Sequence, residues 1–408
     1  METLLVLSHL TVILLFGVIF AMLAKRWRIP HPLFLMLSGL LLGQIEYNGE
    51  PLIDFPHIFV TSIGIIALVL VVFDASSRFK WKEFDTLTKQ ASKITMTFLV
   101  VNALLLTILT TIVFDMSNIY LAMIFAVLMS GTSADVVLSM FQEQKNKVTN
   151  LLEVESILNT PLTVLLPFII LSVMQTVHIE IDVYSGIAIE LLKVIQQFVT
   201  GIGAGVIMGI IIFKLMRKYY SSKLSPLILI TSTLLTYILA EHLSGNGVVA
   251  VTILGLFFGN LYVKQKHVLF EFSSTFGNSL MILVFVLVGL KIDVPLGDLS
   301  FLISSFVLFV LYVAIRSMTI YISTLGGEYT NKEKIFMTLN FPKGIAAAVI
   351  AFSLVSYNFG ASGLSFTSLP GGELTLNLIV IFMLYSLALS TVVTRFSKYF
   401  IRVDITKK

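Results

Sequence analysis

The sequence predicts an all-α integral membrane protein with about 13 transmembrane helices, on three observations. First, 57% of the 408 residues are hydrophobic and only 12% are charged, about half the charged fraction of a soluble domain. Second, apolar stretches of roughly 20 residues, enough to cross a bilayer, follow one another along the chain. Third, two of these stretches are interrupted near the middle by polar residues, glycine and proline, which indicates unwound backbone inside the membrane.

The first seven predicted spans include the first of the two interruptions. The spans cover about 4–24, 33–45, 57–77, 94–114, 119–141, 151–176 and 196–216. Span 119–141 is broken at Ser130–Asp135. Residues 184–195, ahead of the seventh span, are predicted to form an amphipathic lead-in at the membrane interface. Because unwound backbone at bilayer depth is tolerated only around a polar cavity, the break predicts an ion or solute site.

The remaining six spans include the second interruption. They cover about 225–243, 247–263, 272–290, 300–324, 333–355 and 374–394. Span 333–355 is broken at Asn340–Gly344. Paired discontinuous helices in the two halves of a chain are typical of secondary transporters.

The placement of positive charge predicts the orientation of the chain. Of the 27 lysines and arginines, 23 lie in the loops after odd-numbered spans or in the C-terminal tail. By the positive-inside rule these segments are cytoplasmic, which places the N-terminus outside and the C-terminus in the cytoplasm of a multi-pass cell-membrane protein.

Weak internal similarity predicts an inverted-topology repeat with two crossed discontinuous helices, spans 5 and 12. Gly39–Gly43 resembles Gly255–Gly259, and Leu68–Phe73 resembles Leu283–Val288. Chance resemblance of apolar segments is the alternative for each pair alone. Since partners are separated by seven spans, the second copy would be upside down. The chain is then one transmembrane domain, with a first repeat over about 1–176, a connector helix over about 184–217 and an inverted second repeat over about 225–401.

Ionisable residues within the spans are candidate functional groups, because a charge in the bilayer is costly unless it faces a cavity or a partner. They are Asp74, Asp135, Glu153, Glu155, Arg316 and Lys343. Arg316 is expected to form a salt bridge, and Lys343, near the midplane, is expected to pair with a carboxylate, Glu155 in the first place. Glu153 is expected nearer the water.

Polar side chains on the sixth span predict a cation site. Glu155 with Asn159, and Ser156 with Thr160, are four residues apart and therefore share a helix face. Together with Thr132 and Ser133 in the first break, the hydroxyls and the amide of Ser156, Asn159 and Thr160 could supply oxygen ligands for a hard cation such as Na+. The alternative is that Ser, Thr and Asn only join helices by hydrogen bonds.

The composition argues against several other classes. The chain has no cysteine, so thiol chemistry and thiolate metal sites are ruled out, and its six histidines lack the spacing of metal ligands. We expect neither an enzyme nor a bound cofactor, and no nucleic-acid partner. The expected partners are an alkali cation, protons and the lipid bilayer.

Three motifs resemble the monovalent cation–proton antiporter family, the sodium/proton exchangers. They are Gly131–Asp135, Glu155–Thr160 and Pro342–Gly344. The resemblance implies a homodimer in which a core of spans 4–6 and 11–13 moves against a scaffold. The sequence departs from the family pattern at Ser133 and Thr160, where the family usually has aspartates.

The function predicted from these features is exchange of a monovalent cation, Na+ in the first place, for protons by alternating access. Since Thr160 cannot carry a proton, either a carboxylate elsewhere does so, Asp135 before Asp74 and Glu155, or the chain has lost proton coupling. The alternatives are a K+/H+ exchanger, or a solute carrier on the same fold without proton coupling.

Overall fold

A computed structural model shows a protein built almost entirely of helices. It describes residues 2–27, 31–47, 50–51, 53, 55–77, 86–133, 136–137, 146–177, 183–218, 224–260, 266–292, 294–326, 329–355, 357–359 and 364–401. The only strands in this part of the chain form two short antiparallel hairpins. They are β1 (Glu46–Tyr47) with β2 (Glu50–Pro51), and β3 (Asn358–Phe359) with β4 (Leu364–Ser365).

The first half of the chain contains helices at each predicted span. They are α1 (Glu2–Trp27), α2 (His31–Gly43), α3 (His57–Ser77), α4 (Thr86–Phe114), α5 (Ile119–Leu128) and α7 (Lys147–Val177). Helix α4 begins eight residues before the predicted span 94–114, because the polar residues ahead of that span continue the helix. Helix α5 ends before the predicted interruption, and helical structure resumes at Val136–Val137.

The second half agrees with the prediction at most boundaries. Its helices are α8 (Val183–Lys218), α9 (Ser225–His242), α10 (Gly247–Asn260), α11 (Lys266–Lys291), α12 (Leu299–Ser323), α13 (Asn331–Leu339), α14 (Ile345–Val355), α15 (Gly372–Arg395) and α16 (Ser397–Phe400). The predicted lead-in 184–195 is not separate, because it continues without a break into the seventh span as one helix, α8. The end of predicted span 247–263 lies outside the described residues.

Six of the described helical segments are long and apolar enough to cross a membrane. They are Val6–Ala24, Leu87–Phe114, Lys147–Leu171, Ile195–Met216, Leu299–Ser323 and Gly372–Arg395. Six shorter apolar helical segments, from 10 to 17 residues, accompany them. The protein is therefore a multi-pass helical membrane protein.

Side-chain caps fix where several helices begin. Asn118 accepts a hydrogen bond from the Tyr120 amide at the start of α5, over 3.1 Å. At the start of α13, Thr330 and Glu333 form a reciprocal capping box. These contacts satisfy amides that a helix N-terminus leaves without an intrahelical partner.

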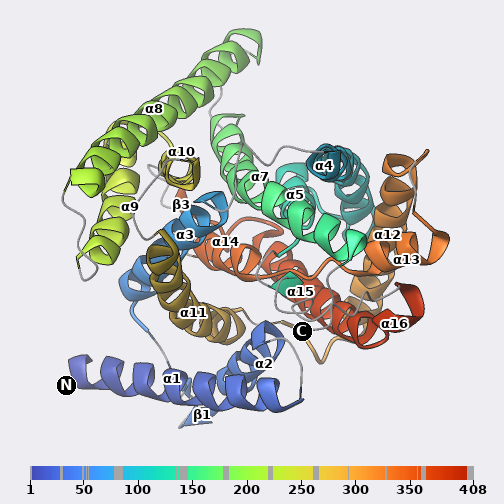
Figure 1. Cartoon of the computed structure of the whole chain (residues 1–408). Coiled ribbons are helices and arrows are strands. Elements are labelled where there is room, and N and C mark those ends of the chain that lie inside the picture. The colour runs from blue at the N-terminus through green and yellow to red at the C-terminus, as the bar shows by residue number, and fades with distance from the viewer. Residues whose placement is uncertain are drawn as a thin grey trace.

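The helices form two flanks joined at the centre. Figure 1 shows α8, α9 and α10 on one side and α4, α12 and α13 on the other. Helix α3 packs against α10 of the first flank and also against α14, while α4 packs against α5, α7 and α12. Helices α3 and α14 therefore lie at the contact between the two flanks.

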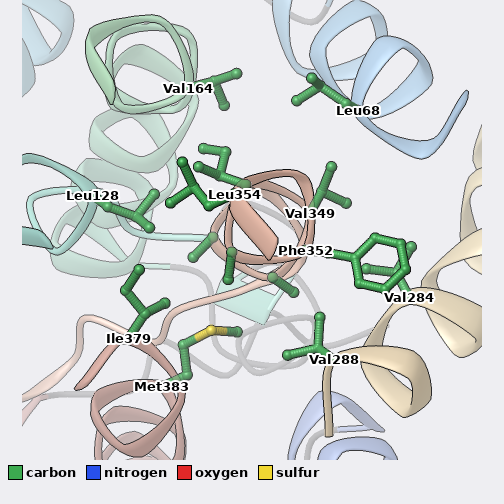
Figure 2. Packing of buried hydrophobic residues seen from close by; sticks show 14 of the residues in the cluster. Leu68, Leu128, Val164, Val284, Val288, Val349, Phe352, Leu354, Ile379 and Met383 are labelled. Atoms are coloured by element: carbon green, nitrogen blue, oxygen red, sulfur yellow. The ribbon is translucent and has the colours of Figure 1, made fainter. Parts of the chain in front are cut away.

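Helix α14 lies in the middle of the apolar core. Figure 2 shows Val349, Phe352 and Leu354 of α14 surrounded by Leu68, Leu128, Val164, Val284, Val288, Ile379 and Met383. The three α14 side chains are fully buried. Because α14 begins directly after the second helix break, this packing fixes the position of that break.

Candidate functional site

The first helix break exposes backbone carbonyls at the end of α5. The amide of Met129 bonds to the Phe125 carbonyl over 2.9 Å, and the amide of Ser130 to the Val127 carbonyl over 3.0 Å. Residues 131–133 that follow are not helical. The last carbonyls of a helix lack intrahelical partners and carry its negative partial charge. The end of α5 can therefore bind a cation.

Side chains at the end of α13 and on α15 form hydrogen bonds around the second break. Asn340 at the end of α13 donates from Nδ2 to the Phe336 carbonyl over 3.1 Å and accepts from the Thr394 hydroxyl over 3.0 Å. Pro342 has no backbone N–H to continue a helix. The amide of Lys343 donates to the Ser386 hydroxyl over 3.2 Å.

The two breaks are in direct contact. The amide of Ser133 donates to the carbonyl of Pro342 over 2.8 Å, and both residues are buried. Gly344 is required at this contact, since a Cβ there would lie 1.8 Å from Ser133 Oγ. Unwound segments that are far apart in the sequence thus share one buried hydrogen bond.

Lys343 places a buried ammonium group at the end of α5. Its Nζ donates to the Met129 carbonyl over 2.6 Å and to the Gly131 carbonyl, and the side chain is 1% exposed. The Tyr312 hydroxyl donates to the same Met129 carbonyl over 2.8 Å. The ammonium therefore binds where the partial charge of the half-helix is negative.

The expected pair between Lys343 and Glu155 is not present, because Arg316 binds Glu155 instead. Arg316 Nη1 lies 2.6 Å from Glu155 Oε1, and Nη2 donates to Oε2 over 2.8 Å. Both side chains are buried, at 0% and 1% exposure. The guanidinium also lies 4.6 Å from the centre of the Phe98 ring. A planar guanidinium suits a bidentate carboxylate contact better than an ammonium does, so the carboxylate selects Arg316.

Asn159 joins the sixth predicted span to the first break, while Ser156 and Thr160 bond to carbonyls of their own helix. Asn159 donates from Nδ2 to Thr132 Oγ1 over 2.6 Å, and its Oδ1 accepts from the Thr132 amide over 3.1 Å. The Thr160 hydroxyl donates to the Ser156 carbonyl over 2.7 Å, and Ser156 Oγ donates to the Glu153 carbonyl over 2.7 Å. Thr132, Ser156, Asn159 and Thr160 are all at most 6% exposed.

These contacts leave oxygen lone pairs next to the breaks. Each hydroxyl has one proton and two acceptor lone pairs, so Ser156 and Thr160 can donate to the backbone and still accept from, or coordinate, another group. Asn159 uses both ends of its amide on Thr132. Two basic side chains, Arg316 and Lys343, are buried in the same region as these oxygen atoms, and of the two only Arg316 has a carboxylate partner among the described residues.

The remaining predicted acidic residues are Asp135, Asp74 and Glu153. Asp135 is outside them, so its side chain is not placed. Asp74 is half-buried in the last turns of α3, and Glu153 is half-buried in α7. Among the described residues no group of three or more His, Asp or Glu side chains has the arrangement of a metal site.

Sequence reasoning missed Tyr312, Ser386 and Asn102. Asn102 donates from Nδ2 to the Ala126 carbonyl over 2.7 Å and to Ser130 Oγ over 3.1 Å, beside the first break. All three are polar residues within apolar spans. Ionisable residues within the spans are the candidates from sequence, and these three residues would have been found if neutral polar residues had been included.

Three comparisons relate this chain to known proteins. The profile described as "Sodium/hydrogen exchanger, transmembrane" matches residues 11–397. The Na(+)/H(+) antiporter NhaH of Halobacillus aidingensis is 26% identical over 350 residues, with 81% of this chain and 85% of that protein covered. The K(+)/H(+) antiporter NhaP of Alkalimonas amylolytica is 23% identical, with 83% and 58% covered.

A solved structure has a similar fold. The sodium proton antiporter MjNhaP1 from Methanocaldococcus jannaschii at pH 8 superposes with a TM-score of 0.77 at 19% sequence identity. The alignment covers 97% of this chain and 99% of that one.

Proposed function

Because the chain belongs to the sodium/hydrogen exchanger family and is thus a transporter rather than an enzyme, we propose that it exchanges Na+ for protons by alternating access. The observation that carries this proposal is the contact between the two helix breaks, Ser133 N to Pro342 O over 2.8 Å. Discontinuous helices that meet at depth supply the polar centre that a transported ion needs.

The proposed cation site consists of Thr132, Ser156, Asn159 and Thr160. Hard monovalent cations prefer oxygen ligands, and these four side chains supply hydroxyl and amide oxygens within two interacting segments. In the structure the amide oxygen of Asn159 accepts from the Thr132 amide. Cation binding would then draw on the same oxygens that hold the first break to α7, which couples the ion to the position of the break. We include Ser133 in the proposed proton and cation site because it lies in the first break.

Charge balance supports Asp135 as the proton carrier. The Glu155 and Arg316 charges cancel in their salt bridge, so this pair offers a cation no net negative charge. Lys343 is a further basic group at the breaks, and a transported cation therefore needs an additional carboxylate nearby. Asp135 is two residues after Ser133 in the sequence. When this group binds either a proton or the cation, competition couples the two fluxes.

Asp74 is proposed to act at the cytoplasmic entrance to the site, because it lies near the end of α3. Glu155 would contribute indirectly, since Arg316 binds its carboxylate.

The test is exchange in proteoliposomes that contain the purified protein. With an imposed pH gradient, addition of Na+ should dissipate the gradient in the unsubstituted protein, and Asp135→Asn should abolish this response. Asp74→Asn is expected to weaken it or to shift its pH dependence. Asp135 is not the carrier if Asp135→Asn exchanges at the normal rate.

K+/H+ exchange is the second candidate, since the relative from Alkalimonas amylolytica is a K+/H+ antiporter. Addition of K+ or Li+ in the same assay separates the two. The absence of a response to every alkali cation by folded, inserted protein would favour a solute carrier without proton coupling, which the neutral residues Ser133 and Thr160 permit.

The finer architecture is also part of the proposal. It comprises about thirteen spans, repeats over about 1–176 and 225–401 around a connector over about 184–217, and crossed discontinuous helices. The chain is placed in the cell membrane as a homodimer, with its N-terminus outside and its C-terminus in the cytoplasm. Cysteines introduced at Asn48 and Lys407 should label from opposite sides, and native mass spectrometry should give twice the 45.2 kDa chain mass.

A further inference from the structure

A cavity of about 340 Å³ lies at the contact between the two flanks, away from the helix breaks. Its walls come from α3, α7, α8, α9, α10 and α14, and Glu241 of α9 is among the lining residues. We propose that this cavity is a waiting site in which a monovalent cation binds the Glu241 carboxylate before it reaches the central site. The inference rests on the proposed transport function, and adds to it a second cation site.

The Glu241 carboxylate is held in a fixed position. Its Oε1 accepts from the Gly247 amide at the start of α10 over 2.8 Å. Gly247 permits this contact, because a Cβ there would lie 2.9 Å from Oε1 and 2.6 Å from the Tyr237 ring. The side chain is nevertheless exposed. Since an ionised carboxylate has about four acceptor positions, one backbone hydrogen bond leaves lone pairs for a cation.

The cavity has the electrostatic character of a cation site. Of the described residues that line it, Glu241 is the only carboxylate and none is Lys, Arg or His. The neighbouring walls carry neutral oxygen groups on Thr61, Gln197, Tyr237 and Ser353. One negative charge in a recess with low-dielectric walls raises the local concentration of cations.

An apolar layer separates the cavity from the central site. Gly64 and Phe352 are in close contact, since a Cβ at Gly64 would lie 2.8 Å from the Phe352 ring. Leu68, Val349 and Phe352 are at most 2% exposed, and Figure 2 shows Val349 and Phe352 on α14 and Leu68 on the neighbouring helix α3. Lys343 precedes the first turn of α14, whereas Phe352 and Ser353 line the cavity at its last turns. A cation in the cavity must therefore wait until α3 and α14 separate.

The competing explanation is that Glu241 only caps α10. Glu241→Gln distinguishes the two, because glutamine retains an oxygen that accepts from the Gly247 amide but has no charge. Glu373→Gln is the matched control, since Glu373 is an acidic residue in the first turn of α15 that lines a different hollow.

The experiment measures Na+-driven exchange in vesicles of both orientations, with Na+ added to one face at a time. Glu241→Gln should raise the KM for Na+ about tenfold, at the lower end of the effect of charged clefts, on the face where α14 ends. Turnover and the KM on the other face should not change, and the shift should shrink as choline chloride screens the charge. Glu373→Gln should leave both constants unchanged.

Two results would overturn the waiting site. One is an unchanged KM in Glu241→Gln, which would leave Glu241 as a cap alone, and the other is an equal shift in Glu373→Gln, which would indicate general surface charge. Binding of ²²Na+ to detergent-solubilised protein provides a readout that does not require exchange. The proposed function fails if the unsubstituted protein shows no exchange. In that case the waiting site is also rejected if Glu241→Gln binds as much ²²Na+ as the unsubstituted protein does.

Discussion

Removal of one partner from the Glu155–Arg316 pair should strongly destabilise the protein. The two contacts are 2.6 and 2.8 Å long, and both side chains are at most 1% exposed. Glu155→Gln leaves the Arg316 guanidinium without a counter-charge, and Arg316→Met leaves the Glu155 carboxylate without one. An unpaired buried charge of this kind costs about 3–5 kcal/mol. The Phe98 ring, 4.6 Å from the guanidinium, contributes about 0.5–2 kcal/mol with or without the Glu155 charge, so it does not offset the loss.

The double substitution should be much less harmful than the two single substitutions together. With Glu155→Gln and Arg316→Met in one chain neither charge of the pair remains, and exchange of a buried ion pair for neutral groups is often close to neutral. The coupling free energy is therefore expected to be at least about 3 kcal/mol, well above the range for independent sites. Glu153→Gln, a half-buried neighbour on α7, should have little effect.

The assay is the apparent Tm of purified protein in detergent, taken from the monodisperse fraction that survives heating. The single variants should melt well below the unsubstituted protein, and the double variant should recover most of the loss. Single variants with an unchanged Tm, or a double variant that loses the sum of both single effects, would refute the reasoning. If the double variant also retains Na+-driven exchange, Glu155 is a structural residue and not a cation ligand.

Two further predictions concern the helix breaks. Lys343→Met should lower the free energy of unfolding by about 1–3 kcal/mol, the cost of one unsatisfied buried acceptor. The Gly131 carbonyl loses its donor, whereas the Met129 carbonyl still accepts from Tyr312. An unchanged Tm would contradict this role of Lys343. Gly344→Ala should lower the free energy of unfolding by about 1–3 kcal/mol through overpacking and should slow exchange, because the new Cβ would lie 1.8 Å from Ser133 Oγ. The control is Gly203→Ala, whose new Cβ has no atom within 4 Å and which should behave like the unsubstituted protein.

The contact at Lys343 illustrates how a broken helix can hold charge. Without the break, the carbonyls of Met129 and Gly131 would accept from amides one turn later in the same helix. The break frees them, and the ammonium binds them instead. Oriented carbonyl groups at a helix end can therefore bind a buried lysine side chain within the membrane.

The sequence alone predicted the helices and the location of the breaks. Runs of apolar residues require helical structure in a membrane, because each backbone polar group must be satisfied within its own segment. Pro342 and the polar residues 130–135 interrupt that pattern locally. For this reason span 57–77 coincides with α3, and the predicted break at Asn340–Gly344 coincides with the gap between α13 and α14.

Only the tertiary structure decided which charged groups form pairs. Glu155 had two basic candidates, 161 and 188 residues further along the chain, and no local pattern ranks partners at such separations. Packing of α4 against α7 and α12 brings Arg316 to the carboxylate, while α14 places Lys343 at the carbonyls of α5. Spacing along a helix constrains neighbours three or four residues apart, but the distances between helices depend on how the side chains of the whole bundle pack.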